Sequence, residues 1–129
     1  MQERIDDAER LARFVFRREL VRADSTVKPD AFIPHPHADC SVTRHTGISE
    51  LGLWDRGEAV GAMRNLPLRG RADVTALAVR GAGLEPETAP REGNPQHANI
   101  VGWPAGKPNQ KHQAQLLAKA AAYAAWPVG

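Results

Sequence analysis

The sequence predicts a single α+β domain over 1–129, in which a short sheet is flanked by an N-terminal, a central and a C-terminal helix. Its 129 residues are the length of one ordinary domain. Hydrophobic residues make up 42% of the chain and charged residues 25%, which predicts an apolar core. Two short runs, 39–45 and 98–103, have the composition of strands and lie between segments with helical spacing.

The first predicted element is an amphipathic helix over residues 2–23. Apolar side chains recur there every three or four positions, as on one face of a helix. They are Ile5, Ala8, Ala12, Val15 and Phe16. Acidic residues crowd the first turns and arginines the later turns, an order that complements the helix dipole. This order explains the arginine run structurally, and the interleaved acids would repel phosphate, so a nucleic-acid-binding face is the less favoured interpretation.

A proline-rich segment separates this helix from the first predicted strand. Three prolines exclude a regular helix from residues 25–38. Residues 39–45 then alternate in character, which predicts a strand with Cys40 and Val42 on one face. Arg44 falls on the same face, where a buried guanidinium would need a partner, so we place it at the strand end.

A central helix is predicted over about 50–64, because Ser49 is a good N-cap and a turn precedes it. Its half-buried face is expected to carry Leu51, Trp54, Glu58 and Val60. Three glycines weaken the helix, or else they permit it to pack closely against the sheet.

The second half of the chain continues the pattern of short strands and helices. Residues 72–79 favour a short strand followed by a helix, with an extended stretch from Leu84, and 85–96 indicate a surface loop. A strand over 98–103 leads to a final helix over 108–125, with Pro108 at its first position. The apolar side of that helix is expected to carry Gln113, Leu116, Leu117, Ala120, Ala121 and Ala124.

Composition also predicts a cytoplasmic protein without a membrane span. No apolar stretch approaches the roughly 18 residues that cross a bilayer. The charged, acidic N-terminal residues do not have the pattern of a secretory signal. One cysteine excludes an intramolecular disulfide, which favours a reducing compartment.

Positive charge is unevenly distributed, although the net charge is only +2. The chain from Gly93 to its end holds three lysines and no acidic residue. Thirteen of the 17 cationic residues are arginine, whose planar fork suits phosphate or carboxylate. The alternative explanation is a genome composition that enriches Ala, Arg, Gly and Pro together.

A phrase of the form His-Ala-Asx occurs twice, each time after a proline and before an apolar run. It occupies residues 37–39 and again 97–99. His37 and His97, at matching strand positions, can act as base and acid on either side of a phosphate or ester. The second copy is the stronger candidate, because Trp103 and two lysines follow it. The alternative is a purely structural role, in which Trp103 anchors the core and the polar side chains form hydrogen bonds within a turn.

A metal site is the less favoured interpretation of the first copy. Thiolates and imidazoles are zinc ligands. The candidates are His35, His37, Cys40 and His45. Imidazoles two positions apart in an extended chain point to opposite sides and chelate poorly. We therefore predict an exposed loop with no metal and no cofactor.

Two basic patterns favour phosphate binding. Lys107 and Lys111 open the final helix, whose free N–H groups already favour anions. Arg69 and Arg71 flank a glycine, a pattern that can grip a phosphate with two forks and a backbone amide. The structural alternative is a solvated turn in which Arg71 pairs with Asp73.

Residues 97–104, with Lys107, resemble a segment of small uncharacterised bacterial proteins that share a His-Ala-Asn-Ile-x-Gly-Trp-Pro motif. The resemblance extends over roughly residues 70–118 and implies no function. The chain departs from the two-histidine phosphodiesterases, because Asp39 and Asn99 stand where that family has Ser or Thr for its phosphate grip.

Together these patterns predict a small basic binding or accessory module that recognises a phosphate-bearing ligand, either nucleic acid or nucleotide. The expected ligand-binding residues are Arg44, Arg69, Arg71, Asn99, Trp103, Lys107 and Lys111, together with His97. One alternative is a hydrolase, such as a phosphodiesterase, that uses His37 and His97. Another is a subunit of a larger bacterial assembly that binds a protein partner through the last helix or Trp126.

Overall fold

The computed structural model describes residues 3–34 and 40–127. Its central feature is a six-stranded antiparallel sheet. The strands are β1 (Arg10–Val15), β2 (Cys40–Arg44), β3 (Gly70–Thr75), β4 (Glu85–Thr88), β5 (His97–Val101) and β6 (Ala122–Ala125). They lie in the order β4-β5-β2-β1-β3-β6. The helices are α1 (Glu50–Arg64), α2 (Ala76–Gly81) and α3 (Lys107–Ala120), with 3-10 turns η1 (Arg18–Leu20) and η2 (Pro29–Ala31). This architecture confirms the predicted α+β class.

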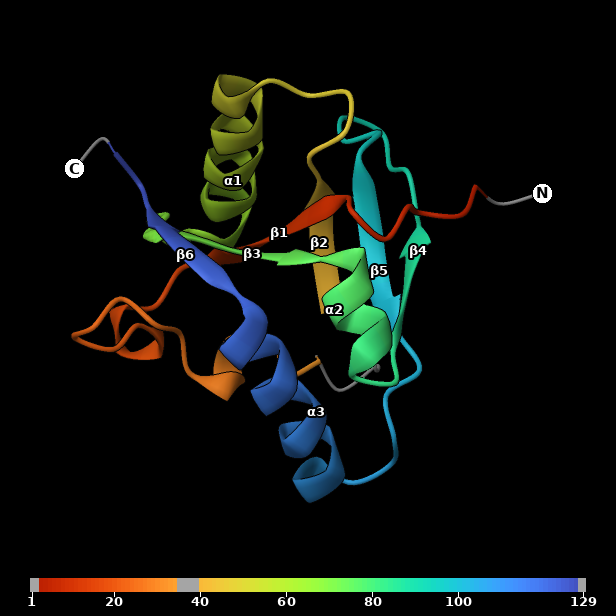
Figure 1. Cartoon of the computed structure of the whole chain (residues 1–129). Helices are drawn as coiled ribbons and strands as arrows, with labels where there is room; N and C mark the ends of the chain where they lie inside the picture. Colours follow the sequence, from red (N-terminus) through yellow and green to blue (C-terminus); the bar gives the residue numbers. More distant parts are fainter. Residues whose placement is uncertain (1–2, 35–39, 128–129) are drawn as a thin grey trace.

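The helices cover both faces of the sheet, and Figure 1 shows α1 and α3 on opposite sides of β1 and β3. The main hydrophobic cluster joins the sheet to α2, α3 and η2, with Leu11, Ile100 and Leu117 all fully buried. A smaller cluster of Phe16, Trp54 and Leu68 lies under α1. Since successive side chains of a strand point to opposite faces, both clusters draw on the same strands.

The predicted N-terminal helix is wrong, because this segment forms the inner strand β1. Val15 belongs to the main cluster and Phe16 to the smaller one, so neighbouring side chains point to opposite faces. That is the period of a strand and not of a helix. β1 pairs with β3 along its whole length, from Arg10–Thr75 to Val15–Gly70. Pairing between distant segments overrode the local helical spacing.

The predicted strand and helix in the middle of the chain are confirmed, but the predicted buried face of the helix is partly wrong. β2 covers 40–44, and α1 begins after Ser49, whose hydroxyl accepts a hydrogen bond from the Gly52 N–H. The helix ends at Asn65 in the left-handed region, with φ of 56°. Leu51, however, is 70% exposed, because α1 presents a different face to the sheet. That face carries Leu53, Trp54, Gly57 and Gly61.

The segment after α1 also forms the predicted strand and short helix, β3 and α2. The loop prediction for 85–96 needs correction, because its first four residues form β4 and pair with β5. β4 alternates between exposed and buried positions, with Pro86 and Thr88 inside. This alternation is the pattern of an edge strand with one solvated face.

The final helix is shorter than predicted, because α3 ends at Ala120 and residues 122–125 form β6 along β3. Its buried positions are Ala114, Leu117 and Ala118, so Leu116, 40% exposed, was wrongly placed inside. The Tyr123 hydroxyl donates to the Arg69 carbonyl and helps to fix β6 at the sheet edge. None of the helices within 3–34 and 40–127 has the length and apolar composition to cross a membrane.

Candidate ligand-binding pocket

The candidate site begins where strands β1 and β2 separate. Their ladder consists of two pairs, Leu11–Arg44 and Ala12–Thr43, and β1 then continues along β3 alone. The Arg13 side chain fills the gap: its Nε donates to the Ala31 carbonyl and its Nη1 to the Ser41 carbonyl, both at 2.9 Å. A guanidinium thus satisfies a carbonyl that a neighbouring strand would otherwise bond.

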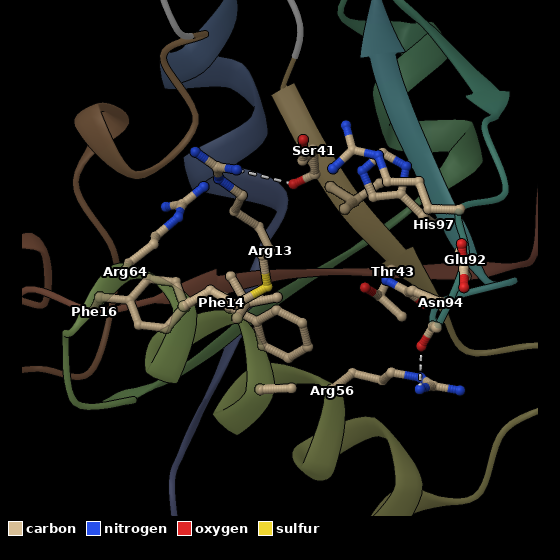
Figure 2. A pocket seen from close by; sticks show the side chains of 16 residues that line it. Arg13, Phe14, Phe16, Ser41, Thr43, Arg56, Arg64, Glu92, Asn94 and His97 are labelled. Carbon is tan, nitrogen blue, oxygen red and sulfur yellow. Dashed lines mark hydrogen bonds between the residues drawn. The ribbon is translucent and has the colours of Figure 1, made fainter.

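A pocket of about 360 Å³ lies at this gap, beneath α1 and beside the segment 91–94. Its apolar lining comes from β1, β2 and α1, and Figure 2 shows Phe14 and Phe16 among the side chains around it. The remaining apolar lining consists of Val42, Ala59, Val60 and Met63. A concave, largely apolar pocket with a few converging polar groups is the usual form of a small-molecule site.

Four arginines line the pocket: Arg13, Arg56, Arg64 and Arg91. Among the described residues, none of the four lies within 4.0 Å of a carboxylate oxygen. Glu92 is the acidic residue of the lining. Because guanidinium groups stay charged in proteins, the lining carries an excess of positive charge.

Two of these arginines lie together at one end of the pocket. Figure 2 shows Arg13 and Arg64 on the same side, above the Phe16 ring. The Arg64 guanidinium carbon lies 5.5 Å from the centre of that ring, within cation–π distance. Partial desolvation lowers the pKa of Arg64, although its side chain is exposed, and the nearby charge of Arg13 lowers it further. Two like charges held close together favour an anion between them.

His97 lies at the other end, where Figure 2 also shows Glu92 and Asn94. Its side chain is 5% exposed, and its Nδ1 lies 2.8 Å from the Ala89 carbonyl oxygen. A carbonyl oxygen only accepts, so Nδ1 carries the proton. Burial lowers the pKa of His97 below its ordinary value of 6.5, which keeps the ring neutral near pH 7.

Two of the arginines predicted as ligand-binding residues pair instead with carboxylates of the fold. Arg44 binds Glu9 through Nε at 2.6 Å and through Nη2 at 2.9 Å. The Arg71 Nε binds Asp73 at 3.1 Å, which is the predicted pair, but both residues are buried in β3 and not in a solvated turn. Arg71 also contacts Glu50 and lies 4.5 Å over the ring of Trp54. The charges of Arg44 and Arg71 are therefore both compensated by carboxylates of the fold.

The other predicted ligand-binding residues lie outside the pocket. Arg69 is exposed beside a second hollow near Trp126, and Asn99 sits within the sheet opposite Ser41. Trp103 packs against the main cluster and donates to the Ile100 carbonyl at 2.9 Å. Lys107 and Lys111 are exposed at the start of α3, on the far side of the sheet from α1 (Figure 1). The structure therefore brings His97 alone, of this set, to the pocket.

The candidate metal ligands do not form a group in the described chain. His35 and His37 lie outside the described residues, so the hydrolase hypothesis, which needs His37, stays a prediction. Cys40 is fully buried, and burial raises the pKa of its thiol. His45 donates from Nε2 to Asp73 at 3.1 Å. Within 3–34 and 40–127, three potential metal-binding side chains do not come together anywhere.

No protein-family model matches this chain, and no curated protein or solved structure is significantly similar to it. The resemblance of 97–104 to small bacterial proteins therefore stays a prediction.

The arginines of the pocket are not predicted as a site because they come from three separate segments: β1, α1 and the segment 91–94. Arg13 belongs to the arginine run of the predicted N-terminal helix, which the helix dipole explains, and Arg56, Arg64 and Arg91 belong to no recognised motif. One signal was available in α1: Arg56, Val60 and Arg64 recur at intervals of four, on one face of the helix. Nothing local indicates that this face meets β1 and β2.

Proposed function

We propose that this protein is a binding module for a small phosphate-bearing ligand of nucleotide size, held in the arginine-lined pocket. One observation carries the proposal: four arginines that have no carboxylate partner among the described residues line a largely apolar pocket, whereas Arg44 and Arg71 are each paired with acids. Guanidinium forks bind phosphate oxygens through short, charge-assisted hydrogen bonds. We assign the phosphate to the end formed by Arg13 and Arg64.

A small ligand fits this site better than a nucleic-acid strand does. A pocket of about 360 Å³ is in the range of small-molecule sites. Proteins that bind single strands use instead an extended basic groove with stacked aromatic rings. Lys107 and Lys111, which would extend such a surface, lie on the opposite side of the sheet (Figure 1).

Calorimetric titration with ribose 5-phosphate and the four nucleoside 5′-monophosphates tests the proposal, with the variant Arg64→Gln. Arg64 is exposed and makes no carboxylate contact among the described residues, so its loss should leave the fold intact. Because a charge-assisted hydrogen bond is lost, affinity should fall about tenfold or more. Arg18→Gln is the matched control, since it removes an exposed arginine that is not part of the pocket lining and should change affinity little.

Three outcomes would overturn the proposal. In the first, the wild-type protein binds none of these phosphates. In the second, Arg64→Gln and Arg18→Gln weaken binding equally, which would indicate non-specific charge attraction. In the third, only single-stranded oligonucleotides bind, with an affinity that Lys107→Gln reduces and Arg64→Gln does not.

A further inference from the structure

Polar atoms without partners gather at the His97 end of the pocket. In the described part of the chain, buried and unpartnered side-chain atoms include Nε of Arg56, Oδ1 of Asn94 and Nε2 of His97, all from residues that line the pocket. Gln96 and Asn99 contribute two more such atoms from the same stretch of chain. Buried polar groups in proteins normally have partners, so this concentration calls for an explanation.

His97 defines the chemistry of that end. Its Nδ1 carries the proton that the Ala89 carbonyl accepts, and the neutral ring therefore presents Nε2 as a lone pair. An arginine or lysine could pair with this lone pair, but no donor among the described residues does so. A ligand group that pairs with this nitrogen would donate an N–H or O–H.

The two ends of the pocket thus suit different groups of one molecule: an anion at one end and a hydrogen-bond donor at the other. Figure 2 shows Arg13 and Arg64 on one side and His97 on the other, with Phe14 lower in the view. The apolar side chains of Val42, Val60 and Met63 complete the lining and suit a flat ring system. A nucleotide has this layout, with its phosphate at one end and the polar edge of its base at the other.

We propose that the ligand is a nucleoside monophosphate, or a molecule of the same layout, whose base edge donates a hydrogen bond to Nε2 of His97. This inference rests on the proposed phosphate site. The atom is shielded from solvent by its neighbours, so binding must displace part of the lining next to it. The segment 91–94 lines the pocket together with His97, and Arg56 donates to the Gly93 carbonyl and so connects this segment to α1.

The test compares the best-binding nucleoside monophosphate with ribose 5-phosphate, which has the phosphate and no base, on three proteins. In the wild type the nucleotide should bind roughly tenfold more tightly, as expected for one well-formed hydrogen bond plus ring contact. His97→Phe should abolish most of this advantage, whereas His97→Gln, whose side-chain oxygen can accept, should keep it. Ribose 5-phosphate should bind all three proteins equally.

The results separate this inference from the proposed function. If His97→Phe retains the full advantage of the nucleotide while Arg64→Gln loses affinity, the phosphate site stands and the His97 contact is wrong. If no phosphate binds, both proposals fail. A loss of the advantage in both His97 variants would also overturn the inference, since acceptance of a hydrogen bond would not explain it.

A measurement on the wild type avoids any effect of substitution on folding. The ¹⁵N resonance of His97 Nε2 reports whether that nitrogen accepts a hydrogen bond. It should shift on saturation with the nucleotide and stay in place on saturation with ribose 5-phosphate. Equal behaviour with both ligands would contradict the proposed contact.

Discussion

Arginine side chains in this protein are of two kinds: some form ion pairs that stabilise the fold, and others line the pocket with a charge that no carboxylate of the described residues compensates. Arg44, Arg71 and Arg80 are each largely buried and bonded to at least one carboxylate. Arg13 is bonded to backbone carbonyls, and Arg64 stacks on an aromatic ring. A buried charge needs a compensating partner, so only the second kind keeps charge available for a ligand.

The pH dependence of stability should reveal the neutral state of His97. Burial lowers the pKa of its imidazole in the folded chain below 6.5, so the unfolded chain binds a proton first as the pH falls. The free energy of unfolding should therefore decrease from pH 6.5 down to the lowered pKa, below which this contribution is constant. Urea unfolding of the wild type and of His97→Gln at a series of pH values measures it.

His97→Gln should show a smaller decrease over that range, because glutamine does not titrate. Both proteins contain the same other histidines, so the difference between the two curves isolates His97. Identical curves would contradict a lowered pKa at this position.

Among the elements, α1 depends on glycine to approach the sheet. A Cβ built at Gly57 would lie 2.8 Å from the Phe14 ring and 2.9 Å from Leu68. Both neighbours are side chains beneath the helix, so the close approach also shapes the pocket wall that Phe14 forms. The glycines that weakened the helix prediction are therefore part of its packing.

Gly57→Ala should destabilise the protein by about 1–3 kcal/mol, the usual cost of overpacking. Gly81→Ala is the control, because Gly81 lies in α2 with no atom within 4 Å of its built Cβ. That change should be neutral or stabilising, by up to about 1 kcal/mol. Urea unfolding compares the two variants; equal effects would show that steric contact at Gly57 is unimportant.

The elements that the sequence predicted correctly carry strong local signals. Ser49 and Asn65 mark the two ends of α1, and Thr75 caps α2 by accepting from the Ala78 N–H. β1 and β6 were missed, since their local spacing and alanine content favour helix while their hydrogen bonds are made to β3. Strand pairing of this kind joins residues that are distant in sequence, so it leaves no local sequence pattern.

At the scale of the whole molecule, ion pairs fasten the N-terminal segment to the sheet. Arg44 joins β2 to Glu9, whose side chain is 7% exposed, and it also binds Glu3 at 2.8 Å. Arg80 on α2 donates to the Ile5 carbonyl and binds Glu85. Segments far apart in sequence are thus held together by charges.

Arg44→Met should destabilise the protein by about 3–5 kcal/mol, because it leaves the Glu9 carboxylate buried without its partner. Adding Glu9→Leu should recover most of that loss, since no unpaired charge then remains. Thermal or urea unfolding of the single and double variants measures the coupling.

Arg4→Met is the control, because the Arg4–Asp7 pair is exposed and should contribute less than about 1 kcal/mol. If Arg44→Met is no more harmful than Arg4→Met, the Arg44–Glu9 pair does not fasten the N-terminal segment.

The sequence by itself determined the α+β class, the positions of β2, β3, β5, α1 and α2, and the choice of His97 as a functional candidate. These follow from caps, turns and short-range periodicity, which act within a few residues. Only the tertiary structure decided that residues 10–15 form an inner strand and that Arg13, Arg56, Arg64 and Arg91 surround one pocket. Both depend on contacts between distant segments, and those same contacts decide which arginines have their charge compensated by a carboxylate.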